Sequence, residues 1–285
     1  MLYMNEVATY SGMSPEQLMA AMGGATDNSS LSDGNRLPIL KVNYHDSDDD
    51  GNKLEKGNFL LQLPSGNAYG KDVTLRVYGD HMQYKQFDDS GLVNKTIIHT
   101  MKDTPIDQNG GVRCGKPTGK EMALLGPEEK AKFSDIKNYR HLYATVSIAD
   151  ATNSSGETVE VKDIPCLFPL KGMSFIPFSR DVIDPCQTQR LTFQQVNCKP
   201  LTKSHKKGSV TYYTVSFVPD FANTMTLDTK DWELMAKFLD TVNAENKQIL
   251  ESHNKALYAK QANTNDSSMV SEVEGYLDAD FAESA

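Results

Sequence analysis

The chain has 285 residues, of which 39% are hydrophobic and 24% charged; this allows one large domain or two small ones and excludes a small disulfide-stapled protein. No apolar run approaches the ~20 residues that cross a bilayer, and residues 1–35 lack the Lys and Arg that open a secretory signal. Four cysteines are too few for a disulfide framework. We therefore expect an intracellular protein with free thiols. Its formal net charge of −9 is opposite in sign to that of most nucleic-acid-binding proteins.

The first 35 residues are expected to form an N-terminal arm. Ser14 can cap a helix, Pro15 suits the first helical position and Gln17 completes a capping box, so a short helix is predicted here. Residues 23–35 consist mainly of Gly, Ser, Asn and Asp, a composition typical of a flexible linker. We therefore assign residues 1–35 to an arm with a short helix and a linker.

Residues 36–225 are predicted to form a β-rich body. Short runs rich in β-branched and aromatic residues predict strands, and clusters of turn-forming residues separate them. The predicted strands are residues 37–44, 58–63, 72–87, 95–100, 138–149, 157–168, 190–198 and 209–218. This spacing is typical of an antiparallel barrel or a sandwich.

A long amphipathic helix is predicted over residues 226–261, with Asp228 as its N-cap, because apolar residues recur near the helical period from Trp232 to Leu257. Residues 262–285 are acidic, contain no Lys or Arg and are poor in core-forming residues. We therefore predict a disordered acidic tail after the helix.

The negative charge is concentrated at the two ends of the chain. Residues 1–35 and 261–285 contain ten acidic residues and no basic one, so the remainder has 29 Lys and Arg against 28 Asp and Glu. Residues 185–219 contain no acid but five bases, and His205 lies among the last of them. A weaker basic stretch contains Lys102, Arg113, Lys116 and Lys120. Either stretch can also be read as an ordinary solvated loop.

Motifs of enzymes and metal sites are mostly missing, so we predict no catalytic residues, no cofactor and no metal. Residues 46–51 match the first six positions of a calcium loop, but position 12 is Gly57 where a bidentate Glu is required, which favours a polar hairpin turn. The cysteines lack the Cys-x-x-Cys spacing of common zinc sites. A metal at either place stays an open alternative.

Aromatic and basic residues recur together on predicted strand faces. In residues 138–148, Leu142 and its alternating neighbours take one face and leave an aromatic and polar face opposite. Tyr212 is predicted to point outward, directly after a loop containing Lys203, Lys206 and Lys207. Such combinations bind single-stranded nucleic acid by stacking bases on aromatic rings and pairing phosphates with basic groups. Each tyrosine can equally be a core residue, because tyrosines pack well on strands.

The acidic tail adds a second element to this hypothesis. A mobile anionic segment can occupy a basic groove as a mimic of the phosphate chain, and can recruit partners when nucleic acid displaces it. The tail also carries the apolar residues Tyr276, Leu277 and Phe281, which a purely solvating tail does not need.

The chain resembles the single-stranded DNA-binding proteins of tailed bacteriophages. The order of arm, β body, closing helix and acidic tail with a near-terminal aromatic is similar, and the sequences NYRHLYATVS, LKGMSFIPF and TYYTVSFVPD, with Arg113-Cys114-Gly115, look like those of a group from marine phages. The resemblance covers most of residues 37–285. It implies a mainly β, OB-fold-like antiparallel barrel, here with insertions because the β body is long, plus the C-terminal helix and disordered acidic tail.

The resemblance also implies a function. The protein would coat single-stranded DNA in phage replication and recombination, in the cytoplasm of the infected bacterial host. The tail would compete for the DNA groove and contact the phage polymerase or helicase, and the protein would be a binder, not an enzyme, with no membrane partner and with self-association on DNA. The alternative is a β-rich phage structural protein of the virion or its assembly, without DNA binding.

Two sets of residues carry these expectations. The predicted DNA-binding residues are Arg76, Tyr78, Tyr84, Arg113, Lys116, Tyr139, Arg140, Tyr143, Lys203, Lys206, Lys207 and Tyr212. The predicted partner-binding residues of the tail are Glu272, Glu274, Tyr276, Asp278, Asp280 and Phe281.

Overall fold

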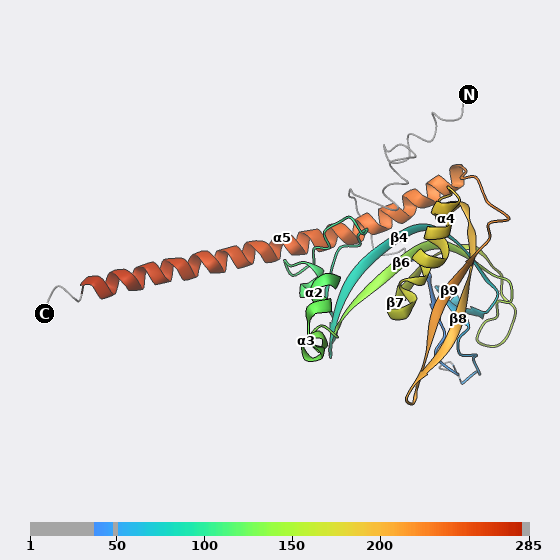
Figure 1. Cartoon of the computed structure of the whole chain (residues 1–285), viewed down its shortest axis with the longest axis horizontal. Coiled ribbons are helices and arrows are strands. Elements are labelled where there is room, and N and C mark those ends of the chain that lie inside the picture. The colour runs from blue at the N-terminus through green and yellow to red at the C-terminus, as the bar shows by residue number, and fades with distance from the viewer. Residues whose placement is uncertain (1–36, 48–50, 281–285) are drawn as a thin grey trace, which may run out of the picture. The chain divides into compact units, whose positions relative to one another are not determined.

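The computed structural model describes residues 37–47 and 51–280, and within them the protein is mainly β with a long C-terminal helix (Figure 1). The strands are β1 (Ile39–Val42), β2 (Phe59–Leu63), β3 (Gly66–Gly70), β4 (Val73–Asp88), β5 (Gly91–Lys95), β6 (Ile136–Ile148), β7 (Val161–Lys171), β8 (Asn197–Lys207) and β9 (Val210–Pro219). The predicted β-rich body and closing helix are thus confirmed. The predicted N-terminal arm lies outside the described residues.

All nine strands belong to one sheet, in the order β3-β2-β1-β7-β6-β4-β8-β9, with β5 paired to β4. The sheet is mixed, since β1 pairs with β7 in parallel, whereas the pairs β1–β2, β2–β3, β4–β5, β4–β8, β6–β7 and β8–β9 are antiparallel. Within the described residues, no pairing joins β3 to β9, so the sheet is open. The predicted antiparallel OB-fold barrel is therefore not confirmed.

The outer edge of β9 shows why the sheet ends there. The backbone N–H of Val215 donates to the Ser174 hydroxyl at 3.0 Å, and that of Phe217 donates to the Asp181 carboxylate at 3.1 Å. Side chains from the short helices that follow β7 therefore satisfy edge groups that a barrel-closing strand would otherwise bind. These helices are η3 (Gly172–Ser174), η4 (Ser179–Ile183) and α4 (Asp184–Thr188).

The described chain divides into two compact units. Unit 1 contains the residues up to Gln83 together with 98–103 and 137–245, and unit 2 contains 84–97, 104–136 and the residues from Asn246 onward. The main core of unit 1 lies between the sheet and the η4–α4 segment, where Leu75, Leu142, Phe168, Phe178 and Phe217 are buried. Alternation along β6 places Leu142, Ala144 and Val146 in this core, as the sequence predicted.

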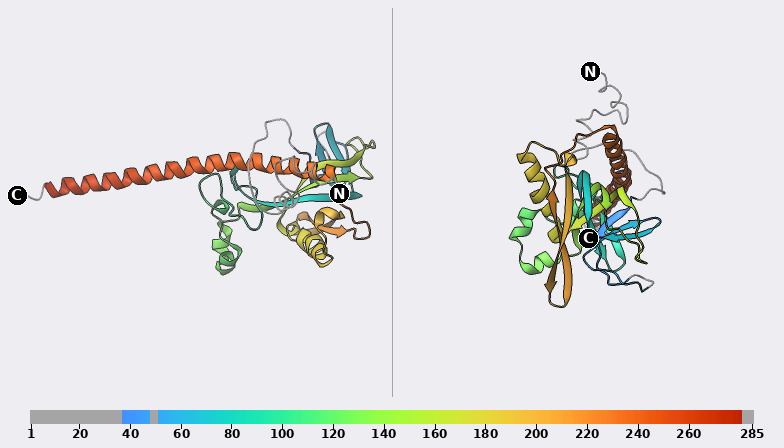
Figure 2. Two further views of the ribbon diagram at one scale, coloured as in Figure 1. Left: turned by 90° about the horizontal axis from the view of Figure 1, so that it is seen from above. Right: turned by 90° about the vertical axis from the view of Figure 1, so that its right-hand side faces the viewer.

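A second core lies on the opposite face of the same sheet. The long helix α5 (Thr229–Asp280) begins at a capping box in which Asp228 and Asp231 exchange side-chain-to-backbone hydrogen bonds of 3.0 Å, so the predicted cap at Asp228 is confirmed. Its first turns bury Met235 and Phe238 against the sheet. Figure 2 shows this part of α5 and the α4 segment on opposite faces of β4 and β6.

Helix α5 extends to Asp280, whereas the sequence predicted its end at residue 261 and a disordered tail beyond. The extension contains helix-forming residues such as Met269, Glu272 and Leu277, and neither proline nor a Gly-based stop signal ends the helix near residue 261. The predicted end of the helix is therefore corrected.

Unit 2 contains β5 together with α2 (Gly119–Leu124), α3 (Pro127–Ala131) and the loop before them. The buried Asp107 carboxylate accepts hydrogen bonds from the backbone N–H groups of Asn109, Gly111 and Cys114 and so fixes this loop. The part of α5 in unit 2 binds the same loop, since Lys260 donates to the Asn109 carbonyl at 2.8 Å.

Candidate nucleic-acid interface

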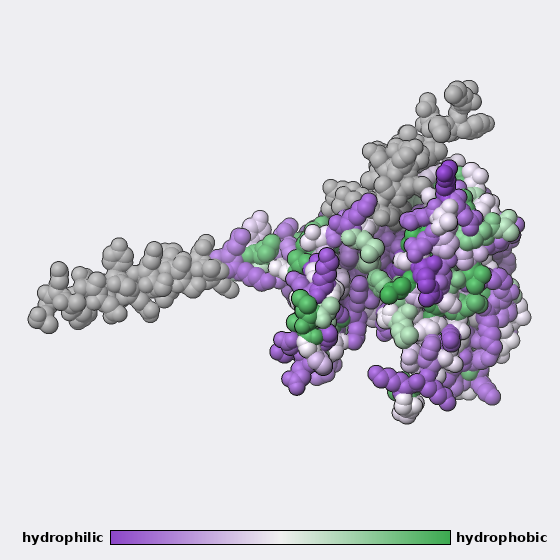
Figure 3. Space-filling model, viewed as in Figure 1, coloured by the Kyte–Doolittle hydropathy of each residue, from purple (hydrophilic) through white to green (hydrophobic). Residues whose placement is uncertain are grey.

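The basic residues 203–207 lie in strand β8, whereas the sequence predicted a loop. Every residue from Cys198 to Lys207 has a partner on β9, and only Gly208 and Ser209 form the turn. Gly208 has φ +61°, a conformation that favours glycine and suits a two-residue hairpin turn. Hydrophilic residues surround the tip of this hairpin, at the lower edge of Figure 3.

The register of the hairpin divides its lysines between two faces. Lys203 is paired with Thr214, and His205 is paired with Tyr212. Directly paired residues share a face and alternate residues along one strand do too, so Lys203, His205, Lys207 and Tyr212 lie on one face. Lys206 lies on the opposite face, and the predicted cluster of three lysines is therefore split.

Tyr212 is held in place by neighbours on both strands and on η3. Its ring stacks on His205 with centroids 5.1 Å apart and an interplanar angle of 15°. A His205 ring nitrogen is hydrogen-bonded to the Thr214 hydroxyl at 2.8 Å, and the Tyr212 hydroxyl donates to the Met173 sulfur at 3.7 Å. The half-exposed Tyr212 ring is therefore fixed before any ligand binds.

A further lysine, Lys171, precedes Met173 by two residues in the sequence. Lys171, at the end of β7, is paired with Tyr139 of β6, and its ammonium group lies 5.7 Å from the centre of the Tyr139 ring. We define the hairpin surface as Lys171, Met173, Lys203, His205, Lys207 and Tyr212. Within the described part of the chain, its three lysines form no ion pair. The surface therefore keeps its positive charge available for an anion.

The opposite face of the hairpin packs against the loop between β1 and β2. The Thr202 hydroxyl donates to the Gly57 carbonyl at 2.7 Å, and the Tyr213 ring contacts Tyr44 edge to face at 5.5 Å. Tyr213 therefore points inward and helps to fix the hairpin on unit 1. Lys206 is on this face, close to the tip.

Four predicted DNA-binding residues are directed into the protein instead of exposed; three are buried, and Arg76 is partly buried. The first two are Tyr78 and Tyr143, which pack against Phe238 of α5 at ring distances of 6.1 and 5.6 Å. Tyr143 is only 2% exposed, and burial raises the pKa of its hydroxyl. The face opposite Leu142 is aromatic because it forms the second core, so neither ring can stack on a base in this conformation.

The other two are Arg76 and Arg140, whose guanidinium groups are already paired. Arg76 binds Asp231 at 2.8 Å, and Arg140 makes two bonds to Asp80, at 2.7 and 2.6 Å. Arg140 is almost fully buried and lies on the core side of β6 with Leu142, not with the aromatic face. Both charges are therefore compensated inside the protein, and their assignment to DNA binding is corrected.

Of the remaining predicted residues, the half-buried Tyr139 lies in unit 1 beside Lys171, and the other three lie in unit 2. Tyr84 is half-buried, burial raises its pKa, and the nearby Arg113 guanidinium opposes that shift. Arg113 is half-buried and has φ +55°, a backbone conformation that is strained for a residue other than glycine. Lys116 instead donates to the Ile136 carbonyl at 2.7 Å. Tyr84 and Arg113 are therefore brought within electrostatic reach of each other, whereas Lys116 stabilises the fold.

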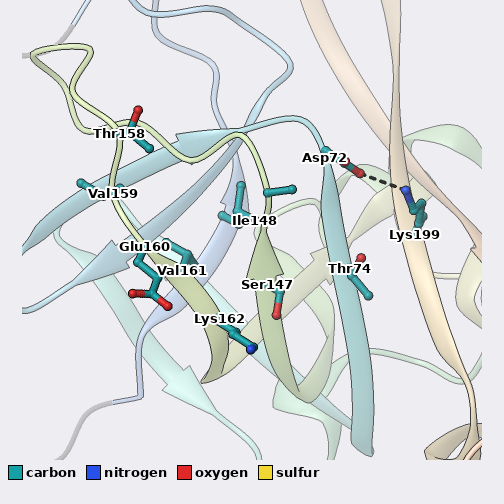
Figure 4. A pocket seen from close by; sticks show the side chains of 11 residues that line it. Asp72, Thr74, Ser147, Ile148, Thr158, Val159, Glu160, Val161, Lys162 and Lys199 are labelled. Carbon is teal, nitrogen blue, oxygen red and sulfur yellow. Dashed lines mark hydrogen bonds and ion pairs between the residues drawn. The ribbon is translucent and has the colours of Figure 1, made fainter.

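A cleft of about 640 Å³ in unit 1 is a weaker candidate (Figure 4). Its charged residues balance, because Lys162 and Lys199 are matched by Asp72 and Glu160. Lys199, part of the predicted basic stretch, points to Asp72 and pairs with it at 3.0 Å. The cleft therefore lacks the excess positive charge of the hairpin surface.

The described residues contain no group of three or more side chains suited to a metal ion. Asp46, at the start of the calcium-like sequence, pairs with Lys56 at 2.7 Å, and residues 48–50 lie outside the described residues. The four cysteines are free, as predicted, and all four are buried. Of the helices described, none combines the length and apolar content of a membrane span.

The tail residues are placed only in part. Helix α5 includes Glu272, Glu274, Tyr276, Asp278 and Asp280, whereas Phe281 lies outside the described residues.

No family model, curated protein or solved structure matches the chain.

Three residues of the hairpin surface were not predicted from the sequence to belong to a site: Lys171, Met173 and His205. His205 was visible within the basic stretch, and its pairing with Tyr212 follows once the two-residue turn is recognised. Lys171 and Met173 carry no periodic signal, because they lie where β7 ends and η3 begins.

Proposed function

We propose that this chain is a single-stranded DNA-binding protein that coats DNA during phage replication and recombination. The hairpin surface carries the proposal: its three lysines form no ion pair with any residue that the structure describes, and on the same surface Tyr212 is stacked on His205 and bonded to Met173. Single-stranded DNA offers the complementary groups, a regular row of phosphates and flat bases that lie on aromatic rings. The protein acts as a binder and not as an enzyme in this proposal.

The physics of the surface favours a single strand over a duplex. Stacking on Tyr212 needs an exposed base face, which a paired duplex offers only at its ends, while the lysines bind phosphates of any sequence. Each stacked base contributes about 1–3 kcal/mol, and each phosphate contact lowers the salt slope of log K by about 0.7. The expected binding is therefore independent of sequence and sensitive to salt.

The remaining parts of the proposal concern the fold and the acidic end of the chain. In this proposal, the open sheet is a variant of the OB-fold-like barrel with insertions that the resemblance to the phage proteins implies. Residues 262–285 compete with DNA for the hairpin surface and recruit phage polymerase or helicase in the cytoplasm of the infected host. Their deletion should tighten DNA binding, and an unchanged affinity would contradict the competition.

The direct test is fluorescence anisotropy of a labelled oligo(dT) titrated with the full-length protein, at salt concentrations from about 50 to 200 mM, beside a duplex of the same length. Tight binding of the single strand that weakens with salt, with weaker binding of the duplex, would support the proposal. No binding by the full-length protein or by the tail-deleted protein would contradict it, and would turn attention to the structural-protein alternative.

A further inference from the structure

A cavity of about 430 Å³ lies in unit 1, away from the residues of the hairpin surface. Its lining includes Met82 of β4, Ile183 at the end of η4, and Leu191 and Phe193 from the segment that leads to β8. The volume falls within the range of small-molecule sites, about 300–1,000 Å³. Among the polar groups at this cavity are Asp80 and Lys102.

The inner wall is apolar and partly aromatic. Phe193 lines the cavity and is held edge to face by the buried Phe178, with ring centroids 5.8 Å apart. Met82 is buried beside it. Ile183 ends the π-helix η4, a rare conformation that frequently occurs at functional sites. A flat, weakly polar group would be contacted here by an aromatic ring and a polarisable sulfur.

The mouth of the cavity presents an exposed methionine and a lysine on one turn. The Asp103 carboxylate accepts hydrogen bonds from the backbone N–H and the hydroxyl of Thr100, both at 2.8 Å, and so fixes the turn. Met101, at the tip, is 86% exposed. Lys102 forms no ion pair with any residue that the structure describes.

The charges at the cavity leave this lysine available for an anion. Asp80 is the acid among the lining residues, and both of its carboxylate oxygens accept hydrogen bonds from Arg140. Since that ion pair is internally neutral, Lys102 is the cation of the lining that has no ion pair with a described residue, and the neighbouring Asp103 carboxylate is directed to Thr100. An apolar interior with a cation at the entrance matches a ligand with a flat apolar part and an anionic part.

We propose that this cavity binds one nucleotide of the single strand, with the base against Phe193 and Met82 and its phosphate at Lys102. The inference rests on the proposed function, because the strand delivers the nucleotide. One segment links the two places: Met173, near its start, contacts Tyr212, and Ile183, at its end, lines the cavity. In this proposal, the bound strand follows this segment from the hairpin surface to the cavity.

The test uses dTMP as the probe, because it separates a single nucleotide from the strand. Saturation-transfer NMR of the full-length protein with millimolar dTMP should detect binding, and 2-deoxyribose 5-phosphate should bind at least about fivefold more weakly because it lacks the base. Lys102→Ala and Met101→Asp change exposed side chains and should each weaken dTMP binding by about fivefold or more. Lys162→Ala, an exposed lysine at the other cleft, is the matched control and should leave dTMP binding unchanged.

The outcomes distinguish the cavity from the wider function. If dTMP does not bind, or if Lys102→Ala leaves dTMP binding unchanged, the nucleotide site is wrong even when oligo(dT) still binds to the hairpin surface. Equal binding of dTMP and 2-deoxyribose 5-phosphate would also overturn it, since only an anion contact would remain. Binding of dTMP by a protein that does not bind oligo(dT) would overturn the proposed function, and with it the delivery of the nucleotide by a strand; only a site for free nucleotides would remain.

Discussion

Replacing Arg140 should lower the free energy of unfolding without weakening the affinity of the protein for DNA. The side chains of Arg140 and Asp80 are only 4% and 12% exposed, and the guanidinium also donates to the Phe175 carbonyl and the Ser179 hydroxyl. Arg140→Met leaves the Asp80 carboxylate buried without its partner, which costs about 3–5 kcal/mol of unfolding free energy. That loss is a large fraction of the ~5–15 kcal/mol that stabilises a typical domain.

Urea unfolding followed by the fluorescence of Trp232, the single tryptophan, measures this loss. Adding Asp80→Ala to the Arg140→Met variant removes the unpaired charge and should recover part of the stability. The reasoning would be refuted if Arg140→Met lost less than about 1 kcal/mol and bound oligo(dT) much more weakly. Arg140 would then be the DNA contact that strand alternation predicted.

Three further predictions concern Tyr143, Gly57 and Cys114. Tyr143→Ala should cost about 3–5 kcal/mol in urea unfolding because the ring fills the second core, and a folded variant with greatly reduced DNA affinity would contradict this. Gly57→Ala should lower the melting temperature, since Gly57 has φ +87° and an added Cβ would lie 2.6 Å from Cε1 of Tyr213; an unchanged value would show that the hairpin yields there at little cost. Burial, with a smaller contribution from Asp107, raises the pKa of Cys114 to about 12, and its thiol should react slowly with a disulfide reagent at pH 8 and rapidly in urea; equal rates would mean an exposed thiolate.

Strand alternation predicted which residues of β6 share a face but not what covers each face. Leu142, Ala144 and Val146 lie in the main core as expected. The face containing Tyr143 looked like a binding surface because it combines aromatic and polar residues. In the structure this face of β6 packs against α5, and it covers the apolar side chains of Met235 and Phe238. A helical apolar stripe shows that such a surface exists, but its location depends on long-range packing.

In the β8–β9 hairpin, the sequence pattern did not indicate the strand itself. Residues 203–207 are polar at almost every position, so no alternation of apolar and polar residues indicated a strand. Their strand is formed by pairing with β9, and the split of Lys206 from Lys203 follows from the register alone. Strand β3 was missed for a related reason, because GNAYG contains two glycines and resembles a turn. The closure of the sheet could not be predicted either, since it depends on pairings between strands far apart in the sequence.

The most direct test of the hairpin surface compares lysines on its two faces. The salt dependence of oligo(dT) affinity is measured for the wild type, for Lys203→Ala combined with Lys207→Ala, and for Lys206→Ala as the matched control. Loss of two phosphate contacts should make the negative slope of log K against log salt less steep by about 1.4, while the control keeps the wild-type slope. Equal slopes for all three proteins, or a loss confined to Lys206→Ala, would contradict DNA binding by the face that carries Tyr212.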